Sequence, residues 1–399
     1  MNNFERYQTF VVQAAAKEGP IDPAVVGSAS FAYGDPETAE AIFAGRSQKP
    51  LYARMGNPTN AYLERLIAGI DEAEGAVVTS SGMGAIAMVS TAMLEAGDEV
   101  VCVGGLFGGS YAFFSQTLPR FGIKAKFYDD AKNIEITPQT KMIFCESIGN
   151  PNMKIVDFET LGRVAKEKGL LFVVDNTLTP LLFDPFKWGA DLIVYSTTKI
   201  ISGHSQALGG AVAFREVRED LLERFSFLKP FVEKLGKKAY MGALKKRSLR
   251  DFGMSMNAYA AHLTILGLQT LALRLQRSCE NTLDIVRALK DEYNILHPLL
   301  SQPERLNRYF PCSCGQMFSI DLESKERAFR FLRNLRLAYI TANIGDARTL
   351  AIHPRSTIYR DFSDEECRFL GVSDGLVRVS VGVESKEAII EDFLWSKNA

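Results

Sequence analysis

Several residue types and patterns that would indicate other classes of protein are scarce in this chain. Its 399 residues include six cysteines and four histidines, too few for a disulfide framework. The Cys312-Ser313-Cys314 run lacks the second ligand pair that a zinc site would need. No apolar run approaches a membrane span, the N-terminus lacks the apolar core of a signal peptide, and the net charge of −1 draws the chain to neither nucleic acid nor a membrane. These absences predict a cytoplasmic protein without a bound metal.

Two common nucleotide-binding signatures are also missing. The glycines at 104, 105, 108 and 109 do not form a dinucleotide fingerprint, and no phosphate-loop Gly-Lys-Ser/Thr is present. Gly203-His204-Ser205 only faintly resembles a nucleophile elbow, because the serine lies well beyond the preceding apolar run. We expect an ordinary loop at that place.

What the chain does contain is a regular alternation of short apolar runs and helical patterns. The predicted strands lie at 77, 99–103, 124–128, 141–145, 171–174, 191–195 and 209–214, and the predicted helices near 60–70, 83–95, 110–119 and 157–168. Such alternation favours an α/β fold with a mostly parallel sheet and helices on both faces.

The pattern changes at about residue 251, where long helical segments (258–276 and 280–293) are followed by short strands after Phe318. We therefore predict an N-terminal arm at 1–55, a large domain at 56–250 and a smaller C-terminal α+β domain at 251–399. The first fifty residues show no strong period, which is why we interpret them as an arm.

A lysine and an aspartate follow two neighbouring predicted strands. Lys199 ends the run Tyr195-Ser196-Thr197-Thr198-Lys199, and Asp175 closes the apolar run before it. Polar groups past such strand ends converge at one edge of a parallel sheet. A pyridoxal phosphate enzyme needs this pair, because the amine forms a Schiff base with the cofactor and the carboxylate keeps the ring nitrogen protonated. A solvated lysine in a loop is the alternative.

Two further segments can bind a phosphate. Ser81-Gly82-Met83 begins a helical stretch, and a helix N-terminus offers free N–H groups and a positive dipole end. Tyr52 and Arg54 place a phenol and a guanidinium ahead of an Asn-Pro turn. The alternatives are a plain N-cap and an exposed pair.

Six blocks that run in order along the chain carry a resemblance to a known family. They are Tyr-x-Arg-x-x-Asn-Pro-Thr (52–59), Ser-Ser-Gly-Met (80–83), Glu-Ser-Ile-Gly-Asn-Pro (146–151), Val-Asp-Asn-Thr (174–177), Ser-x-Thr-Lys (196–199) and Arg-Val-Ser-Val-Gly-Val-Glu (378–384). Together they resemble the trans-sulfuration enzymes, the cystathionine γ-synthase family of fold-type I pyridoxal phosphate proteins. The resemblance spans residues 31 to 384 and implies an aspartate aminotransferase-like fold.

The resemblance also implies roles for individual residues. Lys199 is similar to the Schiff-base lysine and proton shuttle, Asp175 to the partner of the ring nitrogen, and Arg378 to the arginine that binds the substrate α-carboxylate. The other residues expected at the cofactor are Ser81, Gly82, Met83, Phe107, Asn150, Thr177, Ser196 and Thr198, with Asn150 and Asn343 also expected at the substrate.

In such enzymes residues similar to Tyr52 and Arg54 reach the cofactor phosphate of the neighbouring subunit, and we count Tyr52 among the catalytic residues. The implied assembly is a homotetramer built from two dimers.

One departure from the family bears on the substrate. Phe107 stands where the family usually has tyrosine, and phenylalanine can stack on the cofactor but cannot protonate a leaving group. A carboxylate leaves well without such an acid, whereas a thiolate gains from one. The segments 344–350 and 353–357 also resemble the O-acetylhomoserine sulfhydrylase branch.

The predicted activity is therefore a pyridoxal phosphate-dependent transferase of methionine biosynthesis. It replaces the acetate of O-acetylhomoserine with a sulfur nucleophile to give homocysteine. The alternatives are an O-succinylhomoserine sulfhydrylase, a cystathionine γ-synthase and a methionine γ-lyase. Arg348 or Arg355 could supply the extra cation that a succinyl group needs. Sulfide, methanethiol, cysteine and a sulfur-carrying protein are all compatible donors, and a non-catalytic scaffold would not need this set of residues.

Overall fold

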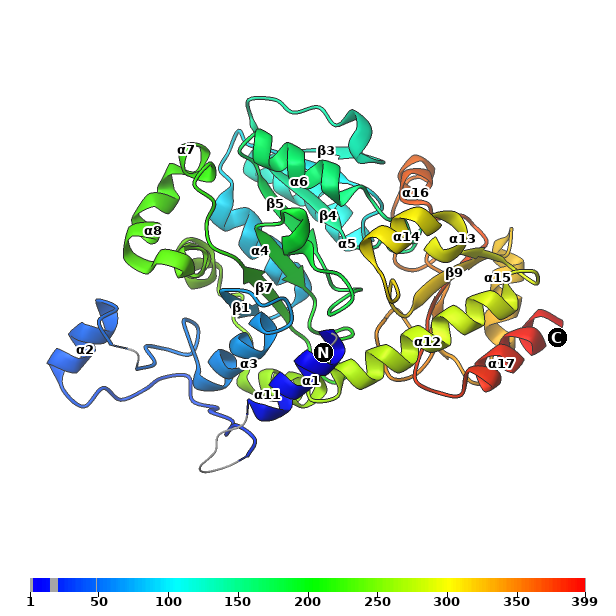
Figure 1. Ribbon diagram of the computed structural model, residues 1–399, viewed down its shortest axis with the longest axis horizontal. Coiled ribbons are helices and arrows are strands. Elements are labelled where there is room, and N and C mark those ends of the chain that lie inside the picture. The colour runs from blue at the N-terminus through cyan, green and yellow to red at the C-terminus, as the bar shows by residue number, and fades with distance from the viewer. Residues whose placement is uncertain (1–2, 15–20, 48, 399) are drawn as a thin grey trace.

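The computed structural model describes residues 3–14, 21–47 and 49–398, so the predicted arm is described apart from residues 1–2, 15–20 and 48 (Figure 1). Most of the chain is organised around two sheets. The strands of the first sheet are β1 (Gly75–Thr79), β2 (Glu99–Val103), β3 (Lys124–Tyr128), β4 (Thr140–Glu146), β5 (Leu171–Asp175), β6 (Leu192–Tyr195) and β7 (Gly210–Phe214).

The order of this sheet is β1-β7-β6-β5-β4-β2-β3, and β7 runs antiparallel to both of its neighbours. All the other strands run in one direction, as the apolar runs predicted. Strands β2, β5 and β6 are rich in valine and isoleucine and are almost fully buried, which is typical of strands covered on both faces of a sheet. The carboxyl ends of β1, β2, β4, β5 and β6 therefore meet at one edge.

Helices cover both faces of the seven-stranded sheet. One face packs against α4 (Gly82–Met93), α9 (Ala239–Leu244) and the segment around Phe114. The opposite face packs against α3 (Pro58–Ala68) and α11 (Ala258–Leu268), and further along the sheet against α6 (Phe158–Glu167) and α14 (Pro303–Tyr309). The result is the three-layer arrangement expected of an α/β fold.

The second sheet is smaller and largely antiparallel. Its strands are β8 (Asn294–Leu296), β9 (Met317–Asp321), β10 (Tyr339–Ile340), β11 (Leu350–Ile352) and β12 (Leu376–Ser380), in the order β10-β11-β12-β9-β8. One face packs against α15 (Lys325–Asn334), α17 (Lys386–Asn398) and the C-terminal half of α12 (Leu271–Leu289). The N-terminal half of α12 packs in the core of the first sheet, so this helix connects the two sheets (Figure 1).

The remaining helices are α1 (Asn3–Gln13), α2 (Pro36–Phe43), α5 (Gly108–Ala112), α7 (Leu221–Arg224), α8 (Lys229–Leu235), α10 (Arg250–Phe252), α13 (Pro298–Ser301) and α16 (Asp364–Leu370). None of the helices in the described part of the chain is long and apolar enough to span a membrane. The predicted domain boundaries stay a prediction, and α11, which follows residue 251, packs on the first sheet.

One local prediction is wrong. The break between the two long helical segments was expected at residues 277–279, but α11 ends at Leu268, and α12 begins at Leu271 and continues to Leu289. A close approach explains the break: a Cβ on Gly267 would lie 2.4 Å from the carbonyl oxygen of Ser202, so the backbone of the loop after Lys199 crosses the helix end there. The arm also contains helices α1 and α2, whose short patterns were too weak to detect.

Candidate active site

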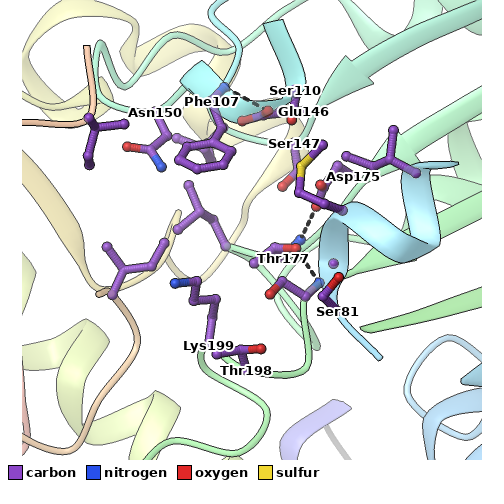
Figure 2. Close-up of a pocket in the computed structure, with 18 of the residues that line it drawn as sticks. Ser81, Phe107, Ser110, Glu146, Ser147, Asn150, Asp175, Thr177, Thr198 and Lys199 are labelled. Carbon is purple, nitrogen blue, oxygen red and sulfur yellow. Dashed lines mark hydrogen bonds between the residues drawn. The ribbon is translucent and has the colours of Figure 1, made fainter. Parts of the chain in front are cut away.

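A cavity of about 310 Å³ opens at the carboxyl edge of the first sheet, where it meets the second sheet. Eleven of the predicted residues line it: Ser81, Gly82, Met83, Phe107, Asn150, Asp175, Thr177, Ser196, Thr198, Lys199 and Arg378. Figure 2 shows Lys199 pointing into this cavity toward Asn150 and Phe107, with Asp175, Thr177 and Ser81 on the neighbouring wall. The cavity-lining residues do not include Tyr52, Arg54 or Asn343.

Lys199 lies in the loop that follows β6. The guanidinium of Arg274 fixes this loop by donating to the carbonyl oxygens of Ile200 and Ile201 at 3.0 and 3.3 Å. The Lys199 amine donates to Oδ1 of Asn343 at 2.7 Å. Asn343 therefore contacts the lysine, although it does not itself line the cavity. Burial, with a contribution from the charge of Arg378, lowers the pKa of Lys199 to about 8. Near neutral pH the Lys199 amine is therefore unprotonated in a larger share of the molecules than an ordinary lysine would be.

Two carboxyl groups lie side by side on neighbouring strands. Asp175 ends β5, and its partner in the register is Glu146 at the end of β4. Burial raises the pKa of Asp175 to about 6, although Thr177 donates its backbone N–H to Oδ1 at 3.0 Å. Burial and the charge of Asp175 raise the pKa of Glu146 well above its usual range. The pKa values of both groups are thus shifted in the direction that disfavours two negative charges at this buried edge.

The roles of Glu146 were not predicted from the sequence. Its carboxylate oxygen accepts the backbone N–H of Phe107 at 2.7 Å, so it positions the segment that carries the aromatic ring (Figure 2). A charged residue at the end of an apolar strand was the available signal. Its meaning depended on the register with Asp175, which the sequence does not state.

Ser81, Gly82 and Ser196 form a narrow cradle at the start of α4. Ser81 caps the helix by accepting the backbone N–H of Gly84 at 3.0 Å. A Cβ on Gly82 would lie 2.6 Å from Cβ of Ser196, so only glycine permits the two segments to approach this closely. The free N–H groups of the first helical turn face this point. The hydroxyl of Thr198 instead donates to Gly209 and accepts from it, at 3.1 and 2.9 Å.

Arg378 enters the cavity from the second sheet. Along β12 the valines at 377 and 379 face the small core, so the alternation turns Arg378 to the opposite side, toward Lys199. Arg378 is 3% exposed, and its guanidinium donates to Asn150 Oδ1 at 3.3 Å and to the carbonyl oxygens of Ala342 and Asn343. Among the described residues no carboxylate lies within ion-pair distance of it. Burial lowers its pKa to about 10, so it remains a cation at neutral pH.

Tyr52 and Arg54 line a different cleft, between the arm and the start of α11. The Tyr52 side chain is exposed, and Arg54 donates to the carbonyl oxygen of Arg250. Within one chain these two residues therefore do not reach the cavity that contains Lys199.

Neither arginine considered for a succinyl group lines the cavity. Arg348 donates to both oxygens of Asp346, at 2.7 and 3.0 Å, and Arg355 binds Asp364 at 2.7 Å. Lys199 and Arg378 are thus the only cations among the described residues of the cavity wall.

These residues fit pyridoxal phosphate. A lysine amine with a lowered pKa is accessible, a carboxyl group and an aromatic ring stand on the walls, and a glycine-led helix N-terminus can receive a phosphate. Arg378 is a buried cation with no anionic partner in the described part of the chain, which suits the carboxylate of an amino-acid substrate.

Comparisons with known proteins agree with this geometry. The family model for Cys/Met metabolism PLP-dependent enzymes matches residues 8–396. O-acetyl-L-homoserine sulfhydrylase 1 of Thermus thermophilus is 33% identical over 399 aligned residues, with 93% of each chain covered. The L-methionine gamma-lyase of Fusobacterium nucleatum subsp. polymorphum is 33% identical over 390 aligned residues, with 94% of this chain and 92% of that protein covered.

A solved structure from Campylobacter jejuni shows the same fold. It was described as a candidate O-acetylhomoserine (thiol)-lyase and contains a pyridoxyl-lysine phosphate residue. Its TM-score is 0.93 at 28% sequence identity, and all of both chains is covered. The predicted fold class and the resemblance to the trans-sulfuration enzymes are confirmed.

Proposed function

The chain belongs to the Cys/Met metabolism PLP-dependent enzymes, and on that premise we propose that it replaces the acetate of O-acetylhomoserine with a sulfur nucleophile to give homocysteine. The observation that carries the proposal is the composition of the cavity wall. Among the described residues that line the cavity, Arg378 is the only one with a guanidinium, Lys199 is the only other cation, and none is a tyrosine.

This composition favours an uncharged acyl group that leaves as a carboxylate. Arg378 is needed for the α-carboxylate, so a succinyl group would find no second arginine. Phe107, Leu208, Ile344 and Ile358 provide apolar contacts instead. Phe107 supplies no proton for a thiolate leaving group, which argues against methionine and cystathionine as the preferred substrates.

The chain's own residues divide the work of the reaction. Bound pyridoxal phosphate supplies an aldehyde that links to amines and a ring that accepts electrons. Asp175 presents an ionised carboxylate for the ring nitrogen, and Arg378 orients the amino acid through its carboxylate. Lys199, once its amine is free, carries protons at Cα and Cβ. Its lowered pKa makes it a competent base near neutral pH.

Substrate assays decide between this proposal and its alternatives. The holoenzyme is supplied with O-acetylhomoserine or O-succinylhomoserine, each with sulfide, methanethiol or cysteine, and separately with methionine. The expected result is the highest kcat/KM with O-acetylhomoserine. Methionine γ-lyase is the second candidate because a relative of that activity is equally identical to this chain. Faster elimination from methionine would replace the first proposal with the second.

The proposed assembly is a homotetramer of two dimers in the cytoplasm, with Tyr52 and Arg54 completing the neighbouring subunit's phosphate site. Their position in a separate cleft of their own chain supports this arrangement. A mixture of Arg54→Ala and Lys199→Ala chains, dissociated and reassembled, should regain activity because some dimers then contain one intact site. No recovery in verified mixed dimers would contradict the shared site.

A further inference from the structure

A chain of hydrogen bonds leads from the Lys199 amine to the protein surface. Lys199 Nζ donates to Asn343 Oδ1 at 2.7 Å, and Asn343 Nδ2 donates to Ser205 Oγ at 2.8 Å. Ser205 Oγ donates to Asp346 Oδ2 at 2.5 Å, and the guanidinium of Arg348 binds both Asp346 oxygens. The chain joins the loop after β6 to the loop before β11, which are about 140 residues apart in sequence.

The direction of every hydrogen bond in this chain follows from the charge at its far end. A carboxylate can only accept, so Ser205 must give its single hydroxyl proton to Asp346. Its oxygen is then an acceptor, which obliges Asn343 to present its NH₂ group to Ser205. The Asn343 oxygen must therefore face Lys199. Without Ser205 the amide could present either end to the lysine.

Asp346 is well suited to anchor such a chain. Its side chain is completely buried, yet burial is outweighed by hydrogen bonds from Arg348 and Ser205 that lower its pKa below the usual value. The loop that carries it is fixed against the lysine loop, because the backbone N–H of Ala347 donates to the carbonyl oxygen of Gly203 at 2.9 Å. A Cβ on Gly345 would lie 2.4 Å from the backbone nitrogen of Ile200, so the two loops touch directly.

Ser205 has an unfavourable backbone conformation. Its φ angle is +53°, in the left-handed region that glycine adopts without cost. A non-glycine residue in this region costs stability and persists where the surroundings require it, commonly at functional sites. The hydroxyl, which glycine lacks, is the feature that links the two loops.

We propose that Ser205 and Asp346 are positioning residues, which act through Asn343 to hold the Lys199 amine in place once the substrate has displaced it. The inference rests on the proposed role of Lys199 as the proton carrier and is independent of which acyl group the substrate carries. Asn343 is the contact residue, and Arg348 neutralises the anchor.

The decisive variant is Ser205→Gly, which removes the hydroxyl and suits the positive φ angle. The holoenzyme is incubated in D₂O with L-norvaline, which has no leaving group, and loss of the α-proton is followed by NMR. We expect the exchange rate to fall about ten- to a hundredfold, since misplacing a catalytic group by about 1 Å has effects of this size. KM for norvaline and the melting temperature should stay at or above their wild-type values.

A pH titration of the holoenzyme's visible absorbance gives a readout that does not depend on turnover. Loss of the fixed acceptor beside Nζ disfavours the protonated nitrogen, so the midpoint should fall in Ser205→Gly. Asp346→Asn should change both readouts in the same direction, and Arg348→Ala should do so more weakly because its guanidinium is half exposed.

Gln206→Ala is the matched control, because Gln206 is the next residue and takes no part in the chain of hydrogen bonds. It should behave as wild type. Wild-type exchange and an unshifted midpoint in Ser205→Gly would overturn the positioning role while leaving the proposed function intact. A wild-type enzyme that fails to exchange the α-proton would overturn both.

Discussion

The two sheets contribute to the cavity in different ways. The seven-stranded sheet places its functional groups at and just beyond strand ends, so that Asp175 and Lys199 meet at one edge while the strands themselves remain an apolar wall. The five-stranded sheet places Arg378 within a strand, on the face opposite its own core. Groups at the first sheet suit the cofactor, whereas the second sheet receives the carboxylate of the substrate.

Buried ionisable groups are stabilised in different ways at the two sheets. Asp175 and Glu146 share a buried edge of the first sheet, and burial raises the pKa of both carboxyl groups. Arg378 keeps its charge while surrounded by carbonyl and amide oxygens. The first sheet therefore carries two neighbouring carboxyl groups, and the second carries a buried cation that can bind the anionic group of a substrate.

Removing the amine of the first sheet should have the largest effect. Lys199→Ala should abolish the visible absorbance of the bound cofactor and lower turnover at least about a thousandfold, because it removes both the attachment point and the base. Absorbance spectra and steady-state assays of the purified variant check this. Full turnover in Lys199→Ala would contradict the mechanism.

Removing the cation of the second sheet should act mainly on binding. Arg378→Ala should lower kcat/KM about a hundredfold, chiefly through KM, since truncating one member of a buried charge pair costs about 2–5 kcal/mol. Arg378→Lys should recover only part of the loss, because lysine cannot make a bidentate contact. Arg360→Ala, at an exposed position, is the control. An unchanged KM in Arg378→Ala would remove the assignment of this residue to the substrate.

Crowding the cradle of the first sheet should have a smaller effect. Gly82→Ala brings a methyl group within 2.6 Å of Ser196 Cβ, and overpacking of this kind costs about 1–3 kcal/mol. Both the melting temperature and the affinity for pyridoxal phosphate should fall, the latter about tenfold. Gly56→Ala is the matched control, since no atom lies within 4 Å of the Cβ position there. Equal cofactor affinity in the two variants would contradict a phosphate cradle at Gly82.

The smallest expected effect is that of the Arg378 charge, on the second sheet, on the pKa of Lys199, on the first. Cofactor capture by the cofactor-free chain needs the unprotonated amine of Lys199, so its rate should rise with pH to a midpoint at about 8 rather than at the ordinary lysine value. The charge of Arg378 contributes to this lowering after burial, so Arg378→Gln should move the midpoint upward. Stopped-flow absorbance after mixing with pyridoxal phosphate measures both midpoints. A midpoint that does not move would show that the two sheets act independently.

Much of the first sheet could be predicted because its signals are local. An apolar run of valines and isoleucines indicates a buried strand, and each predicted run up to residue 214 became one. The helix starts at Asn57-Pro58 and Ser81-Gly82 were equally legible, since an N-cap side chain bonds within three residues of itself. Arg378 was found through the family resemblance, because an arginine in an alternating strand gives no local sign of its burial.

The sequence by itself determined the positions of the first seven strands along the chain, the convergence of Asp175 and Lys199 at one sheet edge and the family to which the chain belongs. Only the tertiary structure decided that Glu146 lies beside Asp175 and has a raised pKa there, that Arg348 binds Asp346, and that Ser205 and Asp346 orient Asn343 toward the lysine. Strand and cap signals depend on neighbours a few residues away. The decisive contacts join segments more than a hundred residues apart, and they exist only where the two sheets pack against each other.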